Sequence, residues 1–406
     1  MREGWREVRL KDVATQNVKP FTVDPDTTYV NLGVQWYAGG TFAREPKLGS
    51  EMKAARLFEV RPGQFIYNRM FVTEGSFALV AQEHSGGVVS NEFPVFDLDE
   101  STVLPSYLLL HFQQPSVWRD IADQATGTTK SRRRWKEGQF LEYSITLPPL
   151  AEQRRIVDLI AAVDDAIAAA EGEAGSAAKL LNAVLDAADD AADISIGSVA
   201  TISSGASWAK VDVRPPDDGG DPVLTITNTK PDGTVAGDPT YVAGLSAKTG
   251  RLTPSSIVAI RTNGNHDRIG NVYRVPDEYL GAAVSAFQLI LEPLIPEDCA
   301  YLYWMMRRPG FQSEVTRAAS GSTGLGNIAA SKLRAMAIPW PKETNDRTEQ
   351  VATYEALVSN QNTARTHAES LRTLRSNLLT VLLSGEHEIP ATYDDLLSNE
   401  DVITAA

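Results

Sequence analysis

The densest cluster of cations in the sequence lies in residues 130–136, where five of seven side chains are lysine or arginine. The cations are Lys130, Arg132, Arg133, Arg134 and Lys136. Lysine and arginine bind phosphate oxygens and so position a protein on a nucleic-acid backbone. The run therefore predicts a segment that contacts phosphates. A solvated loop, or a loop that binds a protein partner, is the competing interpretation.

A second segment is rich in side chains that can read the edges of bases. Its members are Arg261, Asn263, Asn265, His266 and Arg268. Arginine and asparagine pair bidentately with guanine and adenine in the major groove. Tyr67, Asn68 and Arg69 occupy the corresponding place nearer the N-terminus, and Trp208 and Lys210 are further candidates. Because Asn-Gly-Asn is also typical of turns, turn formation is the alternative for the second segment.

Signatures of several enzyme classes are missing from the sequence. The glycine-rich run at 321–326 lacks the lysine of a phosphate-binding loop. No Asn/Asp-Pro-Pro-aromatic motif of an amino-methyltransferase is present, and one cysteine with five scattered histidines predicts no zinc cluster. Asp26, Glu45 and Lys47 form a loose carboxylate–lysine pattern that could bind Mg²⁺ and activate water. A standalone Mg-dependent nuclease is therefore an alternative function, and a helical scaffold that binds no DNA is a third.

Length and composition are those of a globular protein of two or three domains. The chain has 406 residues, of which 43% are hydrophobic and 22% charged. Its single cysteine, Cys299, excludes an internal disulfide, and it has neither an apolar run of membrane-spanning length nor an apolar signal core at its start. We therefore expect a cytoplasmic protein.

The net charge of −14 argues against a general nucleic-acid binder, but the acidic residues are unevenly distributed. Counted along the sequence, residues 1–148 carry a net charge of −1 and residues 194–341 a net charge of 0. Residues 149–193 carry −7 and residues 342–406 carry −6. Either of the two larger segments can thus hold a locally positive face, whereas the acidic segments suit a partner with basic surfaces.

Five short matches recur in the same order at offsets of 186 to 197 residues, which predicts an internal duplication. The pairs are Val13-Ala14-Thr15 with Val199-Ala200-Thr201, Val89-Ser90 with Val284-Ser285, Tyr107-Leu108 with Tyr301-Leu302, Gly127-Thr128-Thr129 with Gly321-Ser322-Thr323, and Glu152-Gln153 with Glu349-Gln350. Each copy begins with short β-prone runs between turn residues and ends in a long helical pattern.

The two long patterns predict helices at about residues 151–192 and 348–384. In the first, apolar residues alternate at steps of four and three from Ile156 to Ala188, a heptad seam that requires a helical partner. The stripe of the second, from Tyr354 to Val381, is less regular. We expect the two helices to pack on each other; packing of each helix on its own domain is the alternative.

Several motifs resemble those of specificity subunits of type I restriction–modification enzymes. They are LPPLAEQRRIV at 147–157, GTTK at 127–130 with Trp135, RTNGN at 261–265, GST at 321–323 with Asn327 and Ile328, and LLSGE at 382–386 with Ile389 and Pro390. The resemblance covers almost the whole chain. One departure is a longer polar segment at 339–350 where the first copy has a compact Pro-Pro-Leu-Ala, so the two domain-to-helix junctions should differ in geometry.

The resemblance implies an α+β fold in which two tandem mixed α/β target recognition domains are separated by two long antiparallel helices that form a coiled coil. The expected parts are recognition domain 1 at 1–148, the first spacer helix at 149–193, recognition domain 2 at 194–341, the second spacer helix at 342–390 and an acidic tail at 391–406.

The implied function is non-catalytic recognition of a bipartite double-stranded DNA site. Each domain would read one half of the site, and the helices would set the spacer and bind two methylation subunits. Motor-nuclease subunits would join for restriction, in defence against phage. No cofactor is expected in this subunit, whereas S-adenosylmethionine, ATP and Mg²⁺ are expected in the partner subunits.

Overall fold

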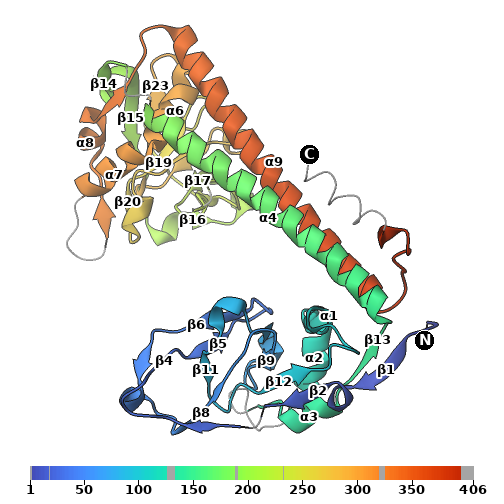
Figure 1. The fold of residues 1–406 in the computed structure, drawn as a ribbon. Coiled ribbons are helices and arrows are strands. Elements are labelled where there is room, and N and C mark those ends of the chain that lie inside the picture. Colours follow the sequence, from blue (N-terminus) through green and yellow to red (C-terminus); the bar gives the residue numbers. More distant parts are fainter. Residues whose placement is uncertain are drawn as a thin grey trace. The chain divides into compact units, whose positions relative to one another are not determined.

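The computed structural model describes residues 2–17, 19–125, 133–187, 191–231, 233–319 and 325–394. The chain divides into two compact units (Figure 1). Unit 1 contains residues 1–169 and 367–406, and unit 2 contains residues 170–366. None of the helices in the described part of the chain is both long enough and apolar enough to cross a membrane.

Unit 1 is built on a four-stranded antiparallel sheet in the order β10-β9-β12-β2. These strands are Phe77–Leu79, Phe65–Tyr67, Val95–Leu98 and Ala14–Gln16. Shorter sheets pair β1 (Arg6–Arg9) with β13 (Ser144–Leu147), β8 (Arg56–Glu59) with β3 (Phe21–Thr22) and β11 (Val88–Val89), β4 (Thr28–Tyr29) with β7 (Lys47–Leu48), and β5 (Leu32–Val34) with β6 (Thr41–Ala43). The shorter helices are α1 (Pro105–Phe112), α2 (Pro115–Gln124) and α3 (Glu137–Glu142).

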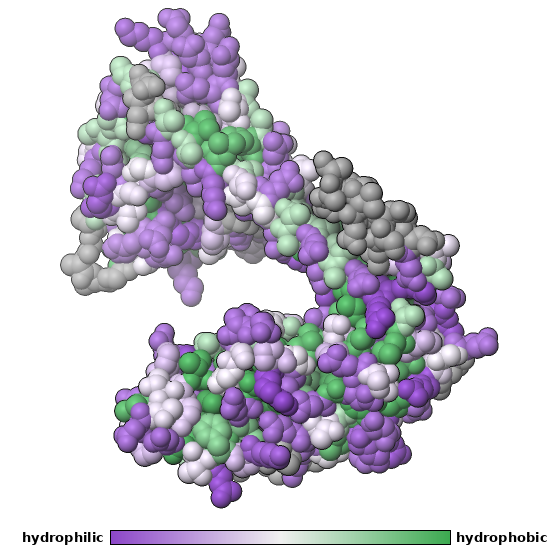
Figure 2. Space-filling model, in the orientation of Figure 1, coloured by the Kyte–Doolittle hydropathy of each residue, from purple (hydrophilic) through white to green (hydrophobic). Residues whose placement is uncertain are grey.

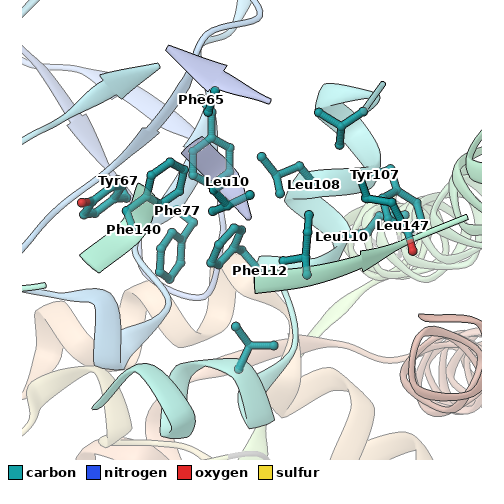
Figure 3. Close-up of a cluster of buried hydrophobic side chains, with 14 of the residues drawn as sticks. Leu10, Phe65, Tyr67, Phe77, Tyr107, Leu108, Leu110, Phe112, Phe140 and Leu147 are labelled. Carbon is teal, nitrogen blue, oxygen red and sulfur yellow. The ribbon is translucent and has the colours of Figure 1, made fainter. Parts of the chain in front are cut away.

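Strand β9, one of the two inner strands of this sheet, is apolar at every position because both of its faces are covered. Alternate side chains of a strand point to opposite faces. Phe65 and Tyr67 accordingly belong to one buried cluster, and Ile66 belongs to another. In the first cluster the rings of Phe65, Tyr67, Phe77, Phe112 and Phe140 gather between the strands and the helices (Figure 3).

Unit 2 repeats this architecture. Its four-stranded sheet has the order β21-β19-β23-β15, with strands Val272–Arg274, Ile257–Ile260, Gln288–Pro293 and Ala200–Ser204. A second sheet joins β16 (Val213–Arg214), β18 (Thr240–Val242), β17 (Asp221–Leu224) and β22 (Ala283–Val284), and two-stranded sheets pair β14 (Asp193–Ser195) with β25 (Ala337–Pro339) and β20 (Thr262–Asn263) with β24 (Gly326–Asn327). The shorter helices are α5 (Ile196–Val199), α6 (Cys299–Arg307), α7 (Pro309–Ala318) and α8 (Ala330–Ala335).

The recurrence confirms the predicted duplication at the level of the fold. Strand β19 is the counterpart of β9 and is likewise buried on both faces, with Ile257 and Ala259 in one cluster and Val258 and Ile260 in another. Each unit also has a two-stranded pair beside the long helices. In unit 1 β1 pairs with β13, which comes just before the first long helix. In unit 2 β14, which comes just after that helix, pairs with β25, which comes just before the second.

The two long helices are α4 (Leu150–Asp186) and α9 (Thr344–Leu383). In unit 1 the first part of α4 packs with the last part of α9, since Ile156 and Ile160 share a buried cluster with Leu379 and Leu382. The guanidinium of Arg375 also binds the carboxylate of Asp164, with Nη2 2.9 Å from Oδ2.

In unit 2 the last part of α4 packs with the first part of α9, because Leu181 and Leu185 share a cluster with Tyr354. Early α4 thus meets late α9, and late α4 meets early α9, so the two helices run antiparallel. The prediction that they pack on each other is confirmed. Ala170, Ala174 and Ala364 of unit 2 and Ala368 of unit 1 are buried, and alanine lets helix backbones approach closely.

The boundaries of both helices differ from the expectation. The first was expected to reach about residue 192 but ends at Asp186, and Asp193–Ser195 instead form β14, which pairs with β25. The second begins at Thr344 rather than 348. Part of the polar segment 339–350 is therefore the first helical turn, and tertiary contacts of Arg347, described below, hold that turn in place.

Candidate nucleic-acid interface

The structure brings together the two predicted sites of unit 1. Trp135, near the end of the cationic run, is fully buried. Its backbone nitrogen donates to Arg69 O (3.2 Å), and the hydroxyl of Tyr67 donates to Trp135 O (3.3 Å). The indole packs edge-on against Phe140 and Phe77. The run is therefore attached to the core at its one aromatic residue, and the cations beside that residue lie next to 67–69.

The cations of the run differ in how much of their charge is available. Arg133 and Lys136 are exposed. Arg134 is half-buried and binds Glu92, with Nε 3.0 Å from Oε2. Lys130 and Arg132 lie outside the described residues. An exposed guanidinium suits phosphate contact better than one paired with a carboxylate, so Arg133 is the strongest phosphate candidate among the described members of the run.

Tyr67, Asn68 and Arg69 are held by their own structure. Tyr67 is fully buried, its phenol lies within the aromatic cluster (Figure 3), and burial raises the pKa of its hydroxyl. Asn68 is 8% exposed, and its side-chain oxygen accepts from Met70 N (3.0 Å). Arg69 forms an ion pair with Glu137. The ring of Tyr67 is too deep in the core to touch a base. Its role at this surface is to support neighbouring residues, such as Trp135, whose carbonyl accepts its hydrogen bond.

In unit 2 the predicted segment forms one connected surface with residues far along the chain. The β20–β24 pair joins Thr262 to Asn327 and Asn263 to Gly326. Arg261 donates to Asn327 Oδ1 (3.1 Å) through Nε and to the hydroxyl of Ser204 (3.5 Å) through Nη1. The resemblance had singled out both 261–265 and Asn327, and the fold places them side by side.

The alternative of turn chemistry also holds for part of this segment. Asn263 is 9% exposed and its Oδ1 accepts from Asn265 N (2.9 Å). Asn265 in turn caps the short helix His266–Arg268 by accepting from Asp267 N (3.0 Å). The amide oxygens of both asparagines are thus used locally, whereas the His266 side chain is exposed.

Among the described residues, the acceptors of the two arginines in the predicted segment of unit 2 are neutral. Arg261 donates to an amide and a hydroxyl, and Arg268 donates to Thr229 O and to the hydroxyl of Tyr273 (3.2 Å). In unit 1, by contrast, Arg69 and Arg134 each bind a glutamate. Unit 2 therefore keeps positive charge at this surface although it has fewer clustered cations in sequence.

The two domain-to-helix junctions are built differently, and sequence reasoning assigned no structural role to the residues that build them. In unit 1 the fully buried Gln153 side chain donates to Thr102 O (3.0 Å) and Pro148 O (2.9 Å) and accepts from Leu104 N (2.9 Å). One amide therefore joins the start of α4 to the start of α1.

In unit 2 a buried ion pair makes the equivalent connection. Arg347 Nε lies 2.8 Å from Asp298 Oδ1, and the two side chains are 5% and 7% exposed. Arg347 also donates to the carbonyls of Pro341 (2.6 Å) and Lys342 (3.1 Å) and lies over the ring of Trp340. The longer polar segment thus folds around one arginine, which confirms that the junctions differ. A lone arginine in the polar gap was the only signal available in the sequence.

The residues of the nuclease alternative lie in a strand-and-turn region of unit 1. Lys47 is in β7, and Asp26 N donates to Asp24 Oδ1 (3.0 Å) in a turn before β4. Within the described ranges no group of three or more His, Cys, Asp or Glu side chains could hold a metal ion. Nothing in the fold or in the comparisons below supports a nuclease.

Comparisons with known proteins agree with the architecture. Residues 2–174 match the family described as the type I restriction modification DNA specificity domain. No curated protein matches the sequence. Several solved structures share the fold, and three of them are the following. The HsdS subunit from Thermoanaerobacter tengcongensis is 18% identical with a TM-score of 0.54, over 95% of this chain and 98% of that chain.

A chain from a structure on complex assembly and conformational transition of the type I R-M system is 17% identical with a TM-score of 0.67, over 94% and 98% of the two chains. The type I restriction–modification S subunit from M. genitalium is 14% identical with a TM-score of 0.51, over 93% and 96%. Residues 2–174 therefore resemble a type I restriction–modification DNA specificity domain, and the whole chain shares the fold of these solved structures.

Proposed function

We propose that each unit reads one half of a bipartite double-stranded DNA site and that α4 and α9 set the length of the unread spacer. The observation that supports this most directly is the repeated sheet: the order β10-β9-β12-β2 recurs as β21-β19-β23-β15. Two copies of one reading domain on a single chain suit a site with two separate halves. When two domains of modest DNA affinity are linked, binding of the first raises the effective concentration of the second at its half-site, so the whole chain binds well.

We further propose that the two long helices bind two methylation subunits, and that motor-nuclease subunits join the complex for restriction. The sequence segments 149–193 and 342–406, which contain these helices, carry net charges of −7 and −6, and such acidic segments repel DNA and suit basic protein surfaces. In this assembly S-adenosylmethionine, ATP and Mg²⁺ belong to the partner subunits. The boundaries 1–148 and 194–341 are proposed for the recognition domains.

An exchange of domains tests the proposal. Residues 1–148 are replaced by the same segment of another specificity chain with different half-sites, and the chimera is produced with the methylation subunit. Sequencing of modified bases in the host genome then gives the recognised motif. We expect one half-site to change completely, while the other half-site and the spacer stay the same, because the reading surface of unit 2 is made from its own residues. A change in both halves contradicts independent reading.

A single-residue variant tests the phosphate contact in unit 1. We expect Arg133→Ala to weaken binding to all DNA sequences alike, because a phosphate contact carries no base information. The slope of log K against log salt concentration should fall by about 0.9, the contribution of one neutralised phosphate. Salt titrations of the complex with DNA measure both effects.

The matched control for this variant is Lys53→Ala, which removes the same charge from another exposed position of unit 1. It should leave the slope unchanged. Equal slopes for the two variants would show that Arg133 is only part of a solvated loop. Loss of the methylation subunit from the Arg133→Ala complex would instead assign the run to a protein partner.

A further inference from the structure

An open apolar cavity of about 280 Å³ lies in unit 2. Three chain segments line it, namely 206–208, 225–227 and 285–287. The segments are held by backbone hydrogen bonds: Ala206 N donates to Val284 O (2.7 Å), Ala286 N to Ala206 O (2.7 Å) and Ser285 N to Leu224 O (2.8 Å). The cavity is therefore preformed by the sheet that contains β17 and β22.

Glycine is required where the first and third segments approach each other. A Cβ at Gly205 would lie 2.0 Å from Ser285 O, so no other residue fits without moving the backbone. This close approach brings the Ala206–Trp208 segment to the edge of the cavity.

The side chains that line the cavity present mainly carbon to it. Ala206, Ala286 and Phe287 have no polar side-chain atoms. Thr225 and Thr227 share a hydrogen bond between their hydroxyls (2.6 Å), and Ser285 Oγ donates to Gln288 Oε1 (2.8 Å). Because these hydroxyls are already bonded within the protein, they demand no polar partner from a ligand.

The cavity adjoins the candidate DNA-reading segment of unit 2. Phe287 O accepts from Arg261 N (2.8 Å) and from Thr262 N (3.1 Å). The backbone of Phe287, a residue that lines the cavity, is therefore hydrogen-bonded to the backbone of Arg261. Phe287 is 47% exposed, which is unusual for an aromatic side chain of this unit. In Figure 2 hydrophilic residues cover much of the visible surface of each unit, with hydrophobic patches between them.

We infer that this cavity binds the C5 methyl group of a thymine in the half-site that unit 2 reads. Alanine, threonine methyl groups and phenylalanine are the contacts that thymine methyl receives in the major groove. The neighbouring Arg261, whose acceptors are both neutral, can hold the phosphates or a guanine edge beside it. The inference rests on the proposed function and adds a base preference to it.

The size of the cavity favours a base over a protein. A stable protein interface buries about 800 Å² on each partner, with a large apolar core. This cavity has three short walls, and one of its lining residues, Phe287, is bonded through its backbone to Arg261. Walls of this size suit one methyl group and the base that carries it. A methylation subunit that docks here is the alternative outcome of the test.

The test removes one methyl group from the DNA. The complex of this chain with its methylation subunit is first used to determine the bipartite site. Each thymine of the half-site that belongs to unit 2, on both strands, is then replaced in turn by deoxyuridine, which lacks only the C5 methyl. We expect one replacement to weaken binding about fourfold, as for the loss of one buried methyl group. Replacements in the other half-site serve as internal controls.

A protein variant links the effect to the cavity. Phe287→Ala should bind the thymine and deoxyuridine duplexes with equal affinity at the sensitive position. The control Leu294→Ala alters a residue of the same unit that is 60% exposed and does not line the cavity, and it should keep the fourfold difference.

The possible failures are distinguishable. A wild-type complex that protects no bipartite site overturns the proposed function itself. A complex that binds its site but discriminates at no thymine, or a half-site without any A·T pair, overturns the cavity assignment alone. Loss of the methylation subunit from the Phe287→Ala complex, with thymine discrimination retained, shows that the cavity is a protein-docking site and also overturns it.

Discussion

Insertion of seven residues into each long helix is expected to lengthen the unread spacer of the DNA site by about three base pairs and to leave both half-sites unchanged. Seven helical residues add about 10 Å, and B-DNA rises about 3.4 Å per base pair. The insertions belong after Ala174 in α4 and before Ala364 in α9, where both helices present buried alanines. Because a paired helix cannot stretch, its length sets the separation of whatever it carries.

The motif is determined by sequencing modified bases in a host that produces the variant with its methylation subunit. In a control variant, seven native residues next to each insertion point are replaced by the inserted sequence, so that the helices keep their length. This variant should keep the original spacer. An insertion in α4 alone should abolish recognition, since Arg375 can then no longer pair with Asp164 while Tyr354 packs with Leu181. An unchanged spacer in the double insertion would refute the role of the helices as a ruler.

The second large effect is expected at the buried ion pair of unit 2. Asp298→Asn should lower the free energy of unfolding by about 3–5 kcal/mol, because it leaves the Arg347 charge buried without its carboxylate. The loss should appear as a lower midpoint of urea denaturation, followed through the fluorescence of tryptophans in unit 2. Replacement of both partners, as in Asp298→Leu with Arg347→Met, should recover much of the stability, since an apolar pair leaves no buried charge.

A matched control is available in the same unit. Arg251 binds Asp221 at 3.0 Å, but these side chains are 33% and 40% exposed. Asp221→Asn should therefore change the stability by less than about 1 kcal/mol. Equal losses for the two variants would mean that solvent screens the Asp298–Arg347 pair as effectively as the exposed one.

The duplication and the helix pairing could be predicted because both leave periodic or repeated patterns in the sequence. The heptad steps from Ile156 onward mark a face that must be buried, and Ile156, Ile160 and Leu181 are indeed buried. The end of the first helix could not be predicted in the same way. Asp193–Ser195 form a strand because β25, more than 140 residues away, supplies the partner.

The cationic residues were predicted by type, whereas their availability was not. Arg69 and Arg134 are ion-paired with Glu137 and Glu92, while Arg261 binds only neutral groups. Tyr67 is a candidate DNA-binding residue in sequence, yet the alternation of β9 turns it into the core beside Phe65. Local sequence shows which groups exist, but the sign and strength of the surface charge depend on distant partners.

By itself the sequence determined that the chain carries two copies of one strand-rich domain, that each copy is followed by a helix in need of a partner, and that cations cluster just before the first helix. Periodicity, turn chemistry and composition act between near neighbours, so they can be read along the chain. Only the tertiary structure decided which cations stay unpaired, how Gln153 and Arg347 build two different junctions, and that segments near 206, 225 and 285 enclose an apolar cavity beside Arg261. These features depend on contacts between residues tens to hundreds of positions apart, and no local pattern records such contacts.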